Sequence, residues 1–493
     1  MAIRSRAQTL ALPYTAVDSR IWPIVALIGF FGWLVMKEIH LPSAFMAVCV
    51  GLGLLGAFMA SVNHPELSLY VLVAYLPFSR LLVGGFGTGA FALNLTNILT
   101  LWVLAIYVIS QLSKGKALFQ RAPINGVVLI FCALGVGSLL NEGAVYGSWV
   151  IFRLISPMKQ WLTPMFFYFL TLWVARDRKT MKTIAVIMMV AVTIVAIMAI
   201  RDYINNAGGS LEKSRVGGIA EQPNTLGAFF VYYMFLFLSF FLVYRKKFKT
   251  WLLLIPFALS FRGIMVTFSR GAYMGFASGL LGAFWHRNKI LFVIVGSLLW
   301  YAIANPWLLP AGIRYRMGQT MVHKSSDVED VVETLEDSSA NRVKIWRATI
   351  EMIKDHPWWG VGYGAFPAYI TPYSGGQFHE VDAHNSYLLI AAELGIPALV
   401  IFLIIVGLSW WHTRWLYLRT KDLSTKAIAL GFLAGLEGLL VVNMFGSRMD
   451  DQAVASYFWI LCALVMRGVL IERQERSQAR ATTKARRLQV QLA

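Results

Sequence analysis

Long apolar runs recur along almost the whole sequence, and they restrict its fold more than any other feature. A membrane-spanning helix needs about 20 consecutive, mostly apolar residues, and about fourteen segments come near that length. They are 21–36, 42–61, 66–83, 92–112, 123–140, 155–175, 183–200, 225–244, 250–268, 271–285, 290–307, 386–409, 427–446 and 452–466. Hydrophobic residues reach 58%, against about 45–50% in soluble domains. The sequence therefore predicts an all-α, polytopic membrane protein with about 12–14 transmembrane helices.

Lysine and arginine residues cluster in the short segments between the apolar runs. The net charge is +19, but the clusters do not form one patch, so we expect no nucleic-acid partner. Under the positive-inside rule such segments face the cytoplasm. The clusters fall at 113–122, 176–182, 245–249, 286–289, 410–426 and after residue 466. This threading predicts that both termini are cytoplasmic and that the segments 201–224 and 308–385 face the outside.

The same pattern predicts four parts in the chain. Residues 1–307 carry the N-terminal transmembrane helices, 308–385 form one large outer loop with short helices, 386–466 carry the C-terminal helices, and 467–493 form a basic cytoplasmic tail. Within the outer loop, 325–338 is acidic and is expected to be solvated. The cysteines lie inside apolar runs, and no His/Cys/Asp set has metal-ligand spacing. We therefore predict no metal and no cofactor.

Four arginines stand on the predicted outer side, where few are expected. Arg215 lies in the glycine-containing stretch SRVGG, and Arg270 lies between two apolar runs in TFSRGAYMGF. Arg342 and Arg347 fall in a predicted helix of about 340–355 that could lie on the membrane surface. Arg270 taken alone fits equally well a side chain that reaches lipid phosphates.

The stretch GGQFHEVDAHNSYLL brings a histidine, His384, to the start of an apolar run, with Asp382 and Asn385 as supporting polar residues. A single histidine at a helix start is usually structural, but here four arginines face the same side. Guanidinium groups match phosphate oxygens, and a neutral histidine can accept a proton from a hydroxyl. Together these residues predict sugar transfer from a lipid diphosphate to an acceptor hydroxyl without a metal ion.

Four stretches together resemble the O-antigen ligase and polymerase superfamily of bacterial membrane proteins. They are HNSYLLIAAELGIPALV, SRVGGIAEQPNTLGAFF, TFSRGAYMGF and NRVKIWRATIEMIKDHPWWGVGYGAF, and the likeness covers roughly residues 200–445. The resemblance implies an enzyme of the inner membrane that acts at the periplasmic face. Its donor would be a glycan on undecaprenyl diphosphate, and its acceptor another glycan or the lipid A–core. Membrane lipids would surround it.

The resemblance also implies roles for individual residues. His384 would be the catalytic base. Arg215 and Arg342 would bind the diphosphate, together with Arg270 and Arg347. Two positions, Ala398 and Ile219, depart from the ligase pattern, which favours a polymerase over a ligase.

Two other classes of protein remain as alternatives. A membrane transporter or flippase of lipid-linked glycans would need polar residues deep in several spans, where Lys159 and Arg262 are the few candidates. A metal-dependent polyprenyl-phosphate transferase would need an acidic pair in its first outer loop, where only Glu38 is present.

Overall fold

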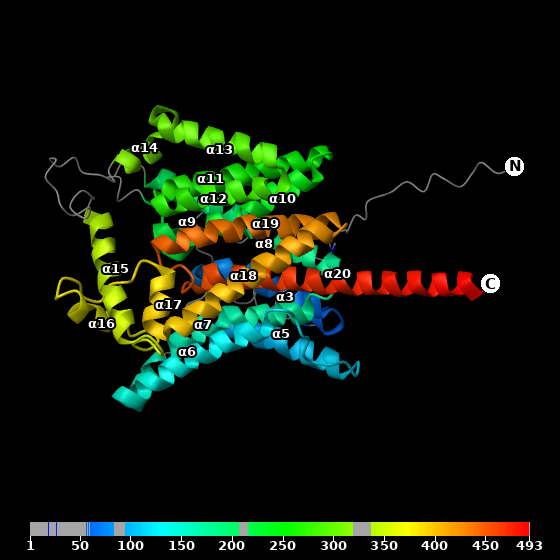
Figure 1. Ribbon diagram of the computed structural model, residues 1–493, viewed down its shortest axis with the longest axis horizontal. Helices are drawn as coiled ribbons and strands as arrows, with labels where there is room; N and C mark the ends of the chain where they lie inside the picture. The colour runs from blue at the N-terminus through cyan, green and yellow to red at the C-terminus, as the bar shows by residue number, and fades with distance from the viewer. Residues whose placement is uncertain are drawn as a thin grey trace.

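The computed structural model describes residues 60–82, 94–206, 215–318 and 337–492, with a few isolated positions before residue 60. All regular secondary structure in these ranges is helical (Figure 1), which confirms the predicted all-α membrane fold. Some predictions lie outside the described residues. They concern the run 21–36, most of the run 42–61, Glu38 and most of the acidic stretch 325–338.

Within the described ranges, eight helices are long and apolar enough to cross a membrane. They are α5 (Leu95–Leu112), α6 (Asn125–Tyr146), α8 (Arg178–Asn205), α9 (Pro223–Tyr233) continued by α10 (Phe235–Tyr244), η4 (Phe248–Leu253) continued by α11 (Leu254–Thr267), α18 (Ile396–Arg419), α19 (Leu423–Val442) continued by η7 (Asn443–Phe445), and α20 (Gln452–Leu492). Three further helices pack beside them: α7 (Ser148–Val174), α12 (Arg270–Arg287) and α13 (Lys289–Ala304).

The predicted run 66–83 is interrupted in the structure. It forms α3 (Pro65–Tyr75), η2 (Leu76–Phe78) and α4 (Ser79–Leu82). Pro77 lacks an N–H and disturbs the helix. Arg80 then turns to the protein, where Nη1 lies 3.0 Å from Asp451 Oδ2 and donates to the carbonyl oxygen of Ala220 at 3.3 Å. Arg80 of this segment therefore contacts protein groups.

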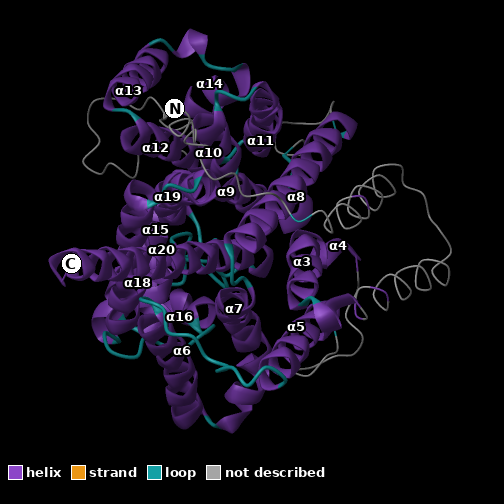
Figure 2. Ribbon diagram, turned by 90° about the vertical axis from the view of Figure 1, so that its right-hand side faces the viewer, coloured by secondary structure: helices purple, strands orange, loops and turns teal. Residues whose placement is uncertain are grey.

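The helix α20 occupies the middle of the bundle, with α7, α18 and α19 around it (Figure 2). Its first half is buried, including Tyr457, Trp459 and Met466. The sequence analysis ended this apolar run at residue 466, but the helix continues to Leu492. The basic tail is rich in Ala, Arg, Gln and Glu, which favour helix. Arg178 of α8 also holds the helix, since its Nη2 lies 3.2 Å from Glu472 and 2.7 Å from Glu475.

The helices α12 and α19 pack with unusually close backbones. A Cβ atom on Gly275 would meet the carbonyl oxygen of Gly438 at 3.0 Å, and one on Gly279 would meet that of Ala434 at 2.8 Å. Small residues allow such contact between membrane helices. The packing also sets the start of α12, because a Cβ atom on Gly271 would lie 3.0 Å from Cβ of Phe445. Arg270 is therefore placed next to η7.

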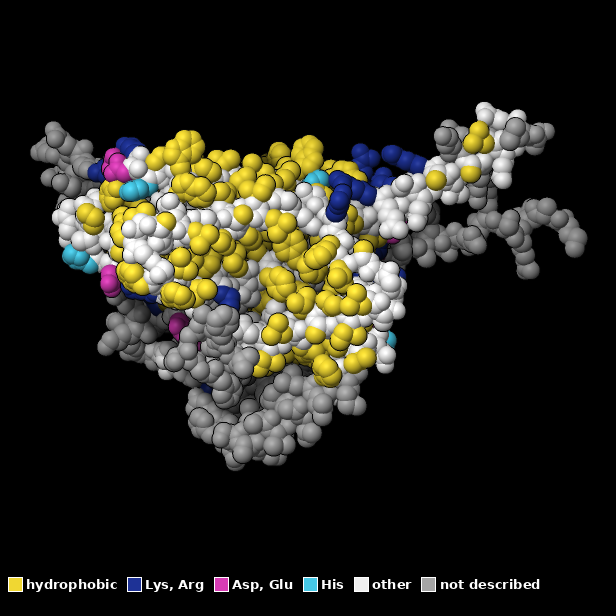
Figure 3. Space-filling view, turned by 90° about the horizontal axis from the view of Figure 1, so that it is seen from below, with side chains coloured by type: hydrophobic (Ala, Val, Ile, Leu, Met, Phe, Trp, Pro, Cys, Tyr) yellow, Lys and Arg dark blue, Asp and Glu magenta, His cyan; other side chains and the backbone are white. Residues whose placement is uncertain are grey.

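Apolar side chains are spread over the flank of the bundle between its two ends (Figure 3). On α6, the side chains of Leu129, Ile130 and Leu140 are exposed. A broad exposed apolar surface is typical of a protein that is surrounded by lipid. The two ends of the bundle differ in their charged residues and in the helices that they carry.

One end of the bundle, called here the basic end, gathers the Lys- and Arg-rich connections. Contacts across this end join distant segments: Arg178 Nη1 donates to Thr425 Oγ1 at 2.8 Å, and the hydroxyls of Tyr244 and Ser424 lie 2.7 Å apart. The opposite end, called here the α15 end, carries α15 (Asp337–Asp355), α16 (Phe366–Tyr373) and the start of α17 (Ser386–Leu394) (Figure 1). Which end faces the cytoplasm stays a prediction.

The predicted outer loop 308–385 contains helices that form a small core of their own. Besides α15 and α16, it includes α14 (Ala311–Gly318). On α15, Ile345 and Met352 are buried against Phe366 and Ile370 of α16, while Ile350 stays exposed. This helix therefore packs on protein along one face and leaves another face open.

Candidate active site

The polar tetrad Asp382–Asn385 ends in a helix cap. The Asn385 Oδ1 atom accepts the backbone N–H groups of Tyr387 at 2.9 Å and Leu388 at 3.1 Å, which fixes the start of α17 at Ser386. Asn385 is therefore a structural N-cap. His384 lies just outside the helix with φ of 51°, a left-handed conformation that is uncommon for residues other than glycine. Strain of this kind often marks functional positions.

Asp382 faces the imidazole of His384. The His384 Nδ1 atom lies 3.2 Å from Asp382 Oδ2, and both side chains are half-buried. Burial acts to raise the pKa of Asp382, but the side chains of His384 and Ser447, followed by the smaller effect of the positive charge of Arg448, outweigh it and hold this pKa below its usual value. An ionised Asp382 favours the tautomer with a proton on Nδ1. The Nε2 atom of His384 is then the one that can accept a proton.

The glycine-containing segment after α15 binds the end of α17 through backbone hydrogen bonds. The segment after α15 donates from Val361 N to the carbonyl oxygen of Ala392 at 2.8 Å and from Gly362 N to that of Glu393 at 3.2 Å. Gly360 has φ of 66°, and a Cβ atom there would overlap with the backbone carbonyl of Glu393. The HPWWGVG stretch thus fastens α15 to the end of α17.

Replacing Gly360 with alanine is expected to destabilise the protein. The φ of 66° costs an L-residue about 1–2 kcal/mol, and the methyl group would also push α17 away. A lower thermal unfolding midpoint in detergent would be the readout. Gly407→Ala is the matched control, because no heavy atom lies within 4 Å of that site and alanine favours helix. Equal midpoints for both variants would contradict the proposed docking.

A tryptophan of α15 touches the histidine loop directly. Trp346 Nε1 donates to the carbonyl oxygen of Ala383 at 3.0 Å. Arg342 is half-buried and lies four residues before Trp346 on the same helix, whereas Arg347 is exposed. Residues four apart share a helix face. The contact therefore brings Arg342 to the side of α15 that faces His384, and it leaves Arg347 turned by about 100° from Trp346.

Arg215 is held against the end of α11. Its Nε atom donates to the carbonyl oxygen of Thr267 at 3.1 Å, and its Nη2 atom donates to Asn224 Oδ1 at 3.1 Å. A cation at the carboxyl end of a helix is favourable. Arg270 starts α12 only three residues after Thr267. Both arginines are therefore placed at the same connection between α11 and α12.

Two further arginines, Arg262 and Arg316, lie near this connection. The charges of Arg316, Arg215 and Arg262 all act on the hydroxyl of Tyr273 in the first turn of α12. Arg262 also lies over the ring of Tyr203, with 5.4 Å from Cζ to the centroid. From the sequence alone, Arg262 is a polar residue within a span, and no pattern points to Arg316 on α14. The connection is thus more strongly positive than predicted.

The loop 446–451, between η7 and α20, carries charged residues that the sequence analysis did not select. Arg448 is 4% exposed, and Asp451 pairs with Arg80 at 3.0 Å. Burial, followed by the negative charges of Asp382 and Asp451, raises the pKa of Asp450 to about 7. These charged residues could have been found from the sequence, because the polar stretch SRMDDQ stands between two apolar runs.

A series of contacts connects the arginine sites with His384. Arg215 donates to Asn224, and the next residue, Thr225, accepts from Arg448 Nη1 at 3.1 Å. Arg448 acts on Asp382, which faces His384. Arg215, Arg270, Arg342 and His384 are therefore all at the α15 end, and Arg347 lies on the same helix as Arg342.

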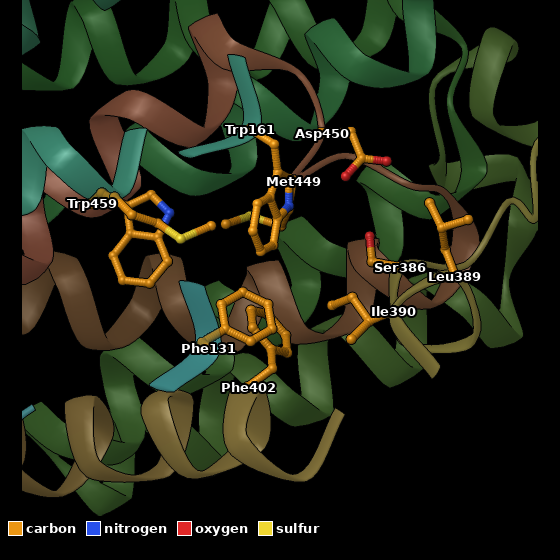
Figure 4. Close-up of a pocket in the computed structure, with 10 residues that line it drawn as sticks. Phe131, Trp161, Ser386, Leu389, Ile390, Phe402, Met449, Asp450 and Trp459 are labelled. Carbon is orange, nitrogen blue, oxygen red and sulfur yellow. The ribbon is translucent and has the colours of Figure 1, made fainter. Parts of the chain in front are cut away.

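A small pocket lies beside the start of α17 (Figure 4). Ser386 and Asp450 are its polar residues, and aromatic and aliphatic side chains form the remaining wall. These are Phe131, Trp161, Met165, Leu389, Ile390, Phe402, Met449 and Trp459. The pocket therefore extends from the polar loop into the apolar interior between α6, α7, α18 and α20.

Among the described residues, no group of three or more His, Cys, Asp and Glu side chains is placed to hold a metal ion. At the connection of α11 and α12, the positive charge comes from arginine side chains. Such a set of groups can bind an anion and can remove a proton next to it.

Residues 255–403 match the family model described as O-Antigen ligase. This stretch runs from α11 into α18 and includes Arg270, Arg342 and His384, while Arg215 and Arg448 lie outside it. No curated protein matches the chain.

Proposed function

We propose that this protein, of which residues 255–403 match the O-antigen ligase family model, transfers a glycan from undecaprenyl diphosphate to an acceptor hydroxyl. The family implies a lipid-linked glycan as substrate. The observation that carries the finer proposal is the placement of an Asp382–His384 pair and several arginines at one end of the bundle.

The arginines at the connection of α11 and α12 would bind the diphosphate of the donor. Arg215 and Arg270 stand at this connection, with Arg262 and Arg316 close by. Arg342 would approach from α15, and Arg347 would contribute at the edge. Preorganised guanidinium groups stabilise the negative charge that develops on a leaving diphosphate. No metal ion is needed for that task in this proposal.

His384 would act as the general base. Its Nε2 atom removes the proton from the acceptor hydroxyl, whose oxygen forms a bond to the anomeric carbon of the donor sugar. The bond between that carbon and the diphosphate oxygen breaks, and its electron pair leaves with the diphosphate. Asp382 holds the imidazole in the required tautomer and stabilises the imidazolium that results. Asn385 supports the site by fixing the start of α17.

The decisive assay uses purified protein with an undecaprenyl-diphosphate glycan, with and without lipid A–core. Transfer to lipid A–core would identify a ligase, and longer prenyl-linked glycan without it would identify a polymerase. The departures at Ala398 and Ile219 lead us to expect the polymerase outcome. Absence of both products with an active, folded protein would contradict the proposed function.

We also propose that the protein lies in the inner membrane of a bacterium, with the α15 end in the periplasm. Support comes from the separation of the Lys- and Arg-rich connections from that end. A cysteine introduced at the exposed Gln377 should react with a membrane-impermeant thiol reagent in cells with a permeable outer membrane. One introduced at Gln478, on the far part of α20, should not react. The opposite pattern would reverse the orientation.

A further inference from the structure

We propose that Arg448 is a positioning residue for the reaction: it holds the loop of Asp382 and His384 against the start of α9 and supplies a buried positive charge beside that loop. This inference rests on the proposed function, because it assigns a role to Arg448 through His384. Arg448 lies in the loop between η7 and α20, outside the residues that match the family model.

The guanidinium group of Arg448 is enclosed by protein. The residue is 4% exposed. Its Nη1 atom donates to Thr225 Oγ1 at 3.1 Å, and its Nη2 atom donates to the carbonyl oxygen of Phe445 at 3.4 Å. Gly446 provides the space, since a Cβ atom there would overlap with the guanidinium. A buried cation is costly unless it is paired, so its retention needs a reason.

The backbone of this loop is tied to the first residue of α17. Arg448 N donates to Ser386 Oγ at 3.2 Å, and the same hydroxyl donates to the carbonyl oxygen of Gly446 at 2.9 Å. Ser386 stands two residues after His384. The side chain of Arg448 thus reaches α9, while its backbone holds α17, and the two bonds fix the histidine loop relative to the stretch that carries Arg215.

The positive charge of Arg448 acts on Asp382. His384 and Arg448 both favour the ionised form of Asp382. Asp382 also repels two other acids electrostatically, Asp450 and Glu393. Arg448 in turn interacts electrostatically with Asp382, Tyr232 and Asp451. The helix α15, which packs on α17, adds Arg342 and Arg347. Among several acids, the enclosed cation favours the ionised form of Asp382.

The test compares Arg448→Gln with Arg448→Lys in the glycan transfer assay over a range of pH. Glutamine removes the charge, so protons bind more readily to the Asp382–His384 pair. The acid limb of the kcat profile should then move to higher pH by about one unit. Lysine keeps the charge but loses the fork, so it should lower kcat about tenfold and leave the acid limb in place. Because Arg448 does not bind the donor in this proposal, KM for the donor should stay within about twofold in both variants.

Three outcomes would overturn the proposal. They are an unchanged acid limb in Arg448→Gln, an equal loss of kcat in both variants without any movement of the limb, and full kcat in Arg448→Lys. If Arg448→Gln does not fold, judged by gel filtration, the lysine variant and Thr225→Val decide. Thr225→Val should lower kcat without moving the acid limb. Wild-type protein in the same assay separates the two proposals, because its failure to transfer glycan would remove the proposed function itself.

Discussion

Replacing His384 with asparagine is expected to lower kcat for glycan transfer by about 10²–10⁴-fold, the usual contribution of a general base. Asparagine is suited to this test, because it tolerates the left-handed φ of 51° at this position. It cannot accept a proton as imidazole does. The variant should therefore fold and insert like the wild type, and it should lose the chemical step.

The matched control is His379→Asn on the same loop. His379 is exposed, and its Nδ1 atom lies 3.3 Å from Thr371 Oγ1, away from Asp382. This variant should keep the wild-type rate. Near-wild-type activity in His384→Asn, measured with purified donor, would remove His384 from the mechanism. Equal losses in both variants would point to damage of the loop and not of the base.

Replacing Arg215 with lysine is the second change with a large expected effect. We expect kcat to fall by about 10²–10³-fold, as when one preorganised donor to a developing anion is removed. The guanidinium is held by two directed bonds, to Thr267 and Asn224. A lysine ammonium cannot make both bonds and also present donors to a diphosphate. Charge alone should therefore not rescue the activity.

Arg314→Lys serves as the control for this substitution, because Arg314 is an exposed arginine of α14 at the same end of the bundle. It should retain the wild-type rate. All of these assays should give the same rates in EDTA, since the account assigns charge neutralisation to guanidinium groups. A rate that requires a divalent ion, or full activity in Arg215→Lys, would contradict that assignment.

Much of the fold could be predicted from apolar periodicity, because lipid-spanning segments need long apolar stretches. The positions at which the helices are interrupted or end were harder to predict. The run 66–83 ends where Arg80 meets Asp451, a partner more than 300 residues away in the chain. The tail of α20 past residue 466 is rich in helix-favouring residues, but its contacts with Arg178 through Glu472 and Glu475 could not be predicted. Such pairings between distant segments leave no local pattern in a sequence.

The roles of the site residues stay a prediction, and only their location can be compared with the structure. His384 and the arginines were selected because charged groups are unexpected beside outer membrane surfaces, and the structure places Arg215, Arg270, Arg342 and His384 at one end of the bundle. Arg448 was missed, since its partners Thr225 and Ser386 come together only through tertiary packing. The stretch that contains Gly360 was selected for its family resemblance, but the close approach of the Gly360 backbone to that of Glu393 could not be predicted.

The central claim is that arginines hold the diphosphate while His384 acts only on the acceptor. Binding of undecaprenyl diphosphate to purified variants tests this claim most directly, because it requires no knowledge of the sugar. His384→Asn should bind the carrier with the wild-type Kd, and Arg215→Ala should bind it at least about tenfold more weakly. Unchanged binding by Arg215→Ala, together with loss of binding by His384→Asn, would contradict the account.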